Sequence, residues 1–218
     1  MENSIRRIIE AHLRQNLSTA IPAKVESVEF LTTKQVIDVA PLINRVYEDG
    51  TVLNPATITD VPLVFPSAGG GVLSFPIKVG DTVLLVYSMR SLDEWTNSDG
   101  TTQTPIDARH FNKSDAIAIP GLYTNTAHLS PNATDVELKF TAIGTSLRLE
   151  ATTGDVVIEN PTHSLKLKSN GDVLHSSGAK ITAAGDFITA AGVSLDNHTH
   201  AQANDSDGNT QVETNSPT

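Results

Sequence analysis

Between Val136 and Asn197 the chain is a succession of short, alternating units, and this repetition limits what the chain can fold into. Segments such as LRLE, VVIE, LKLK, KIT and FIT place an apolar residue at every second position, which is typical of half-buried β-strands. Gly154-Asp155, Gly171-Asp172 and Gly185-Asp186 recur between them as turn signals. The spacing of these pairs is uneven, so a strict single-chain solenoid is not indicated.

The side chains of this region are too small and polar to close a core within one chain. Apolar residues make up 39% of the sequence and aromatic residues only 5%, which is low for a chain that must bury a large core. Short strands with one apolar face suit several chains that wind together and share a core. We therefore expect an intertwined trimeric β-helix over residues 126–196. The alternative is a loose β-meander attached to the preceding domain.

The preceding part of the chain predicts a different architecture. The first residues form an amphipathic pattern typical of a helix, with an apolar stripe made by Ile5, Ile8, Ile9 and Leu13. Strand-like runs follow at 23–31, 35–43, 60–66 and 82–87. About five strands in about 100 residues suggest a small barrel.

The fold class is therefore mainly β. We expect an N-terminal helix, a barrel, the trimeric β-helix and a pointed end. The corresponding domains are residues 1–18, 19–125, 126–196 and 197–218.

Charge and composition exclude several classes of function. The net charge of −10 disfavours sequence-independent binding to nucleic acid, and residues 181–218 carry no Lys or Arg. The absence of cysteine excludes disulfides and thiolate metal sites. No signal peptide and no apolar run of bilayer length are present, so we expect synthesis in the cytoplasm of a host cell.

The pair His198 and His200 is the candidate metal site. Residues two apart on a strand project to the same face, so the pair offers two imidazoles per chain. If three chains meet on a three-fold axis, six nitrogens converge, and this octahedral set suits iron, nickel or cobalt better than tetrahedral zinc.

Signatures of catalysis are lacking in the sequence. There is no G-x-S-x-G, no Walker loop and no H-E-x-x-H. Asp93 and Glu94 beside Trp95 could mimic a glycosidase pair, but neighbouring residues point apart, and the reaction needs facing carboxyl groups. The acidic stretch around Gly208 departs from the register of a calcium loop. We expect no catalytic residues, no small-molecule substrate and no cofactor other than the metal ion.

The segments DVPLVFPSAGGGVLSFPIKVGDTVLLVYSMRSLDEW (residues 60–95) and RHFNKSDAIAIPGL (residues 109–122) resemble the membrane-piercing central spikes of contractile phages, the family typified by the phi92 spike. The β repeats and the end at His198-x-His200 resemble the tips of the same class, including P2-type spikes. The resemblance runs from about Ile5 to His200.

This resemblance implies an OB-fold barrel that joins the spike to a baseplate hub protein. It also implies a homotrimer and a tip that holds one iron ion through His198 and His200 of each chain. The expected function is to pierce the bacterial cell envelope during tail contraction, with only mechanical contact to the outer membrane, and the expected location is the baseplate tip of the virion. The alternatives are an OB-fold module that binds nucleic acid or carbohydrate, and a receptor-binding tail fibre.

Overall fold

The computed structural model describes residues 5, 6, 9, 17–47, 49–204, 206–210 and 212–215. These residues fold as two compact units, the first ending at Leu129 and the second beginning at Ser130. The predicted helix over residues 1–18 lies largely outside the described residues.

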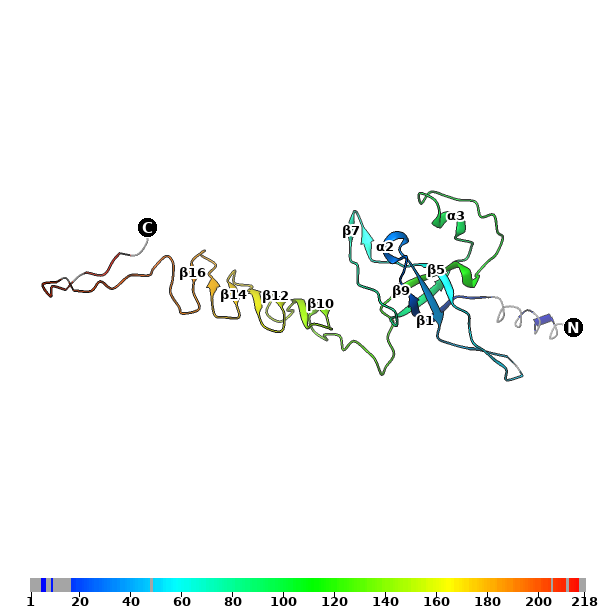
Figure 1. Ribbon diagram of the computed structural model, residues 1–218, viewed down its shortest axis with the longest axis horizontal. Coiled ribbons are helices and arrows are strands. Elements are labelled where there is room, and N and C mark those ends of the chain that lie inside the picture. Colours follow the sequence, from blue (N-terminus) through cyan, green and yellow to red (C-terminus); the bar gives the residue numbers. More distant parts are fainter. Residues whose placement is uncertain are drawn as a thin grey trace. The chain divides into compact units, whose positions relative to one another are not determined.

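The first unit is built on one antiparallel sheet of five strands in the order β5-β2-β1-β8-β9 (Figure 1). The strands are β1 (Ala20–Ser27), β2 (Val36–Pro41), β5 (Ile58–Pro62), β8 (Thr82–Tyr87) and β9 (Ala116–Pro120). Burial alternates along each strand because successive side chains point to opposite faces. On β8, for example, Val83, Leu85 and Tyr87 are buried and the residues between them are not. The buried residues of all five strands form one hydrophobic core.

The sheet curls into a half-barrel, and a short contact joins its two edge strands. Leu63, directly after β5, forms an isolated parallel bridge with Ala118 of β9. The N–H of Val64 donates to the carbonyl of Ala118 at 3.0 Å. The bridge brings the outermost strands of the sheet together around the core.

Smaller elements of the first unit lie between these strands. They are α2 (Leu31–Lys34), β3 (Arg45–Val46), β4 (Val52–Leu53), β6 (Ser67–Ala68), β7 (Gly71–Val72), α3 (Asp93–Thr96) and the 3₁₀ turn η1 (Lys113–Asp115). β3 pairs with β4, and β6 pairs with β7 across a turn that contains Gly69 and Gly70. The strand predicted over 23–31 ends earlier, at Ser27, because residues 31–34 form the helical turn α2.

The second unit is a seven-stranded antiparallel meander in which the strands follow one another in sequence order (Figure 1). The strands are β10 (Val136–Phe140), β11 (Thr145–Leu149), β12 (Val156–Glu159), β13 (Ser164–Leu167), β14 (Val173–His175), β15 (Lys180–Ile181) and β16 (Phe187–Ile188). Their length falls from 5 residues at β10 and β11 to 2 residues at β15 and β16. The sheet therefore narrows toward the C-terminal end.

The mainly β class is confirmed, and the first unit has a curled half-barrel sheet where the sequence predicts a small barrel. The two units use their residues differently. The first has a core of twelve buried hydrophobic side chains. In the described part of the second unit, a single hydrophobic side chain, that of Val157, is buried. A single layer of strands cannot bury both of its faces, so the second unit leaves most of its apolar side chains exposed.

The core of the first unit predicts a large response to truncation of Leu85. This side chain is fully buried at the centre of β8, so Leu85→Ala should lower the free energy of unfolding by about 2–5 kcal/mol. Urea unfolding followed by the fluorescence of Trp95, the single tryptophan, measures the change. Ile119→Ala on β9 is the control, because Ile119 is 41% exposed, and should cost less than about 1 kcal/mol. Equal losses for both variants would contradict the core described here.

Candidate assembly face and metal site

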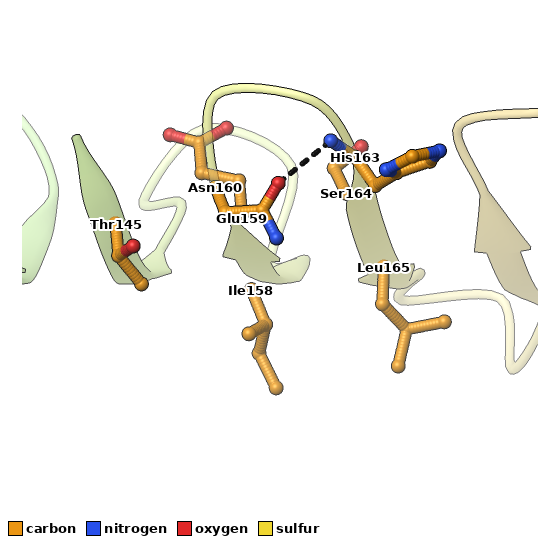
Figure 2. A pocket seen from close by; sticks show the side chains of 7 residues that line it. All are labelled: Thr145, Ile158, Glu159, Asn160, His163, Ser164 and Leu165. Carbon is orange, nitrogen blue, oxygen red and sulfur yellow. Dashed lines mark hydrogen bonds between the residues drawn. The ribbon is translucent and has the colours of Figure 1, made fainter. Parts of the chain in front are cut away.

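One face of the meander is almost entirely apolar. Residues that lie directly opposite each other in an antiparallel pair share a face, and the register places Leu147 opposite Ile158 and Ile158 opposite Leu165. Followed through every strand pair, this apolar face comprises Val136, Leu138, Phe140, Thr145, Leu147, Leu149, Val156, Ile158, Leu165, Leu167, Val173, His175, Ile181 and Phe187. Figure 2 shows Ile158 and Leu165 projecting from adjacent strands to the same side, where they line a shallow depression.

The opposite face carries the charged residues of the sheet, and these pair across strands. Arg148 lies 3.1 Å from Glu159 and 3.4 Å from Glu150. Lys166 lies 3.1 Å from Glu150 and 3.5 Å from Asp155. Such pairs each add little stability at a solvated surface, but they gather the charge of the sheet on the face opposite the apolar one. The sheet is amphipathic across its thickness.

Aspartate side chains join successive turns along one edge of the meander. The carboxylate of Asp155 accepts the N–H of Ser169 at 2.9 Å, and that of Asp172 accepts the N–H of Ala183 at 2.8 Å. Asp135 and Asp186 bond in the same way to the N–H groups of residues 151 and 196. We call these four carboxylates the Asp column. The sequence separation of donor and acceptor falls from 16 through 14 and 11 to 10, so the turns tighten as the strands shorten.

The turns of the C-terminal part of the meander repeat every seven residues. Their glycines are Gly171, Gly178, Gly185 and Gly192, and each N–H donates to the carbonyl three residues earlier. Each glycine has a positive φ, which completes a three-residue hairpin loop of the type that ends in a left-handed residue. At Gly171 a Cβ would also lie 3.1 Å from the Cβ of Ala183. The Gly-Asp pairs at Gly171 and Gly185 mark only every second one of these turns in the sequence.

His198 and His200 lie close together in the structure. Their ring centroids are 5.0 Å apart, and the rings are perpendicular. The Nδ1 of His198 donates to the carbonyl of Ser194 at 2.9 Å and lies 3.2 Å from that of Leu195. This bond fixes the tautomer and leaves Nε2 as the free ligand atom, which is the arrangement that metal-binding histidines commonly show. The pair is therefore suited to donate two imidazole nitrogens to one ion.

The chain after the histidines turns back on itself and returns beside them (Figure 1). The N–H of His200 donates to the hydroxyl of Thr214 at 2.9 Å, and the N–H of Thr214 donates to the carbonyl of His200 at 3.2 Å. The hydroxyl of Thr199 donates to the carboxylate of Glu213 at 3.3 Å. These contacts join residues 199 and 200 to residues 213 and 214 of the returning segment.

Asp93 and Glu94 have structural partners in the first unit. Asp93 lies 2.8 Å from the guanidinium of Arg109, which also binds the buried carboxylate of Asp115 through two hydrogen bonds. These bonds hold the pKa of Asp115 below its usual value. Glu94 accepts the N–H of Ile106 at 3.2 Å. These contacts tie parts of the segment between β8 and β9 to one another and to Asp115, which directly precedes β9.

Two properties of the described residues bear on the remaining site predictions. No group of three or more His, Asp or Glu side chains within that part of one chain is placed to hold a metal ion. No helix found there has the length and apolar character needed to cross a bilayer. A metal ion held by His198 and His200 would therefore need further ligands from other molecules or from solvent.

Comparison with known proteins assigns a class to the first unit. Residues 21–121 match the family model of the phage protein Gp138 N-terminal domain. This segment contains all five strands of the curled sheet. No curated protein matches the chain. The match supports a structural protein of the phage tail or baseplate, located in the virion, and agrees with the phage class expected from the sequence.

The Asp column predicts that the meander loses stability in acid. The backbone N–H groups of Ser169 and Ala183 lower the pKa values of Asp155 and Asp172. A carboxyl group with a lowered pKa stabilises the fold at neutral pH, and this contribution is lost as the pH falls through its folded-state pKa, below about 4.

Asp172→Asn should weaken this acid sensitivity, because the amide oxygen still accepts the N–H of Ala183 but does not titrate. Asp172→Ala should destabilise the meander at neutral pH as well. Thermal unfolding by circular dichroism between about pH 7 and pH 3 separates the variants. An acid transition in Asp172→Asn identical to that of the unaltered protein would contradict a role for this carboxylate.

Proposed function

We propose that three copies of the chain associate through the apolar face of the meander and form the shaft of a phage central spike. The observation that carries this proposal is the exposure of that face. Leu147, Leu149, Ile158, Leu165, Leu167, Ile181 and Phe187 are each 40% to 53% exposed in the single chain. Contiguous apolar surface on this scale marks a site of association.

The energetics favour association over a solvated sheet. Full burial of one leucine or isoleucine side chain is worth about 1.5–3 kcal/mol, and each chain contributes more than ten apolar residues to the face. The loss of translational and rotational freedom on association costs about 4–15 kcal/mol. Three closed faces can outweigh this cost, and the charged face remains in water. The shared core also explains why the second unit buries so few residues by itself.

The shape of the meander suits a spike. Its strands shorten from 5 residues to 2 toward the tip, so a trimer built from it narrows in the same direction. Cross-strand ion pairs and the Asp column lie away from the proposed core and tie each strand to its neighbours. A stiff, narrow and polar-surfaced body is what mechanical penetration of an envelope requires.

The first unit serves as the adaptor in this proposal. Its strand order and the bridge between Leu63 and Ala118 correspond to a five-stranded OB-fold barrel. We infer that this barrel attaches the spike to the baseplate hub protein. The net charge of −10 argues against the alternative of a nucleic-acid-binding barrel.

The metal assignment rests on the orientation of the tip histidines. His198 and His200 of three chains supply six imidazole nitrogens, and we propose that they hold one iron ion. Such an ion would tie together the three chain ends beyond the last strand, where the sheet is narrowest. The protein is then a non-enzymatic part of the virion, carried at the baseplate tip, that pierces the bacterial outer membrane by mechanical contact during contraction.

Substitutions on the two faces of β13 test the trimer. Leu165 and Lys166 are neighbours on the strand but belong to opposite faces of the sheet. Leu165→Gln should weaken or abolish the trimer, because it puts three amides into the shared core. Lys166→Gln removes only the two ion pairs of Lys166 with Glu150 and Asp155, each worth about 0–1 kcal/mol, and should leave the trimer intact. Sedimentation velocity over a concentration series measures both. Equal behaviour of the two variants would exclude this face as the interface.

Replacement of both tip histidines tests the metal site. His198→Ala with His200→Ala should abolish bound iron while the trimer and its β-sheet content persist, because the apolar face lies outside the tip. Elemental mass spectrometry and light scattering on the same sample measure the two properties, and about one iron per three chains is expected in the unaltered protein. Iron retained by the double variant would refute the assignment. Loss of the trimer would mean that the tip initiates assembly.

A further inference from the structure

Two histidines outside the tip lie at the edge of the meander opposite the Asp column. His163 precedes β13 and His175 ends β14. Their rings are stacked, with centroids 5.4 Å apart and planes inclined by 24°. Figure 2 shows His163 at the turn end of the depression that Ile158 and Leu165 line. The pair thus lies beside the apolar face.

His175 belongs to the apolar face itself. The register places it directly opposite Leu165, in the column that also contains Leu138, Leu147 and Ile158. It is the one titratable side chain among the strand-paired residues of that face in the described part of the chain. When other copies cover the face, as proposed above, the imidazole of His175 is enclosed with leucine and isoleucine side chains.

The geometry of the stack favours a neutral pair over a shared metal ion. Lone pairs lie in the ring planes, so two nearly parallel stacked rings cannot direct nitrogens at one point between them. The tip histidines, whose rings are perpendicular, differ in this respect. The Nδ1 of His175 accepts the N–H of Ser177 at 3.1 Å and lies 2.7 Å from its hydroxyl. The Nδ1 of His163 lies 2.9 Å from the hydroxyl of Thr162.

The charged groups on neighbouring strands do not compensate a proton on the stack. Lys166 of β13 and Lys180 of β15 both pair with Leu174, which puts them on the opposite face. Glu159 of β12 borders the depression, but its carboxylate bonds to Ser146 and Arg148 on the charged face. No carboxylate of β12, β13, β14 or β15 is bonded to either imidazole among the described contacts.

We propose that the stack of His163 and His175 makes the trimer sensitive to mild acid. The inference rests on the proposed trimer. Imidazoles in general gain a proton between about pH 8 and pH 5. Protonation of both rings puts two positive charges 5.4 Å apart in each chain, beside a face that has become dry. Charge in such surroundings is strongly disfavoured, so acid opens the shaft at the level of β13 and β14.

The test is the thermal midpoint of the intact trimer at about pH 7.5 and pH 5.5, a range above the titration of Asp155 and Asp172, whose pKa values are lowered. The midpoint of the unaltered protein should fall by about 5 °C or more at the lower pH. His175→Leu, which continues the apolar column, should remove most of this shift, and His163→Gln, which breaks the stack, should reduce it. A midpoint shift that persists in full in both variants would overturn the proposal.

Two controls separate the stack from other titrating groups. His128→Gln alters a histidine of the first unit and should leave the shift unchanged. His198→Ala with His200→Ala removes the tip histidines, and the shift should persist there as well. The molecular mass measured at the higher pH distinguishes a failure of the proposed trimer from a failure of the proposed acid sensitivity. A monomer at that pH would refute the proposed trimer, whereas a trimer with a pH-independent midpoint would refute only the acid sensitivity.

Discussion

The apolar face of the meander is the feature on which the rest of the second unit depends. A single-layer sheet cannot bury both of its faces, and here the more exposed face is lined with leucine, isoleucine, valine and phenylalanine. Water cannot stabilise such a surface, and within the described part of the second unit no further strand or helix covers it. The other features follow from this constraint. The charges are confined to the opposite face, the turns are short, and the edges are tied by side chains and not by additional strands.

The two edges of the meander are tied by different chemistry. The Asp column joins successive turns through charge-to-backbone hydrogen bonds, which are stronger than neutral ones. The opposite edge has the stack of His163 and His175, which tolerates acid poorly. Each strand contributes only 2 to 5 residues of backbone pairing. The side-chain contacts at the two edges are therefore important for holding neighbouring strands together.

The sequence was sufficient to predict the parts of the fold that rest on local pattern. The run of residues 82–87 predicts a strand with the bounds of β8, and the Gly-Asp pairs predict turns. The strand predicted over 23–31 was too long at its C-terminal end. The helical turn α2 forms where the chain reverses toward β2, and the alternation of apolar residues does not reveal such a reversal. The seven-residue spacing from Gly171 to Gly192 was visible in the sequence and could have located every C-terminal hairpin. The partners of the Asp column were not visible, because they are backbone groups whose proximity depends on the register.

For the site, the sequence predicts His198 and His200, and the structure adds their perpendicular rings and the bond that orients His198. The apolar alternation was also evident, but its alignment into one continuous face required the register of all seven strands. The match of residues 21–121 to a phage domain family bears on the barrel alone. The proposed association of the meander is therefore inferred from the residues of the meander itself.

The most direct test of this account is the absolute mass of the unaltered full-length chain in solution, measured by light scattering coupled to size exclusion. The account predicts a single species of three times the chain mass of 23.2 kDa, unchanged on dilution through the micromolar range. A stable monomer with a folded, exposed meander would contradict it, because the apolar face would then exist without the copies that are proposed to cover it.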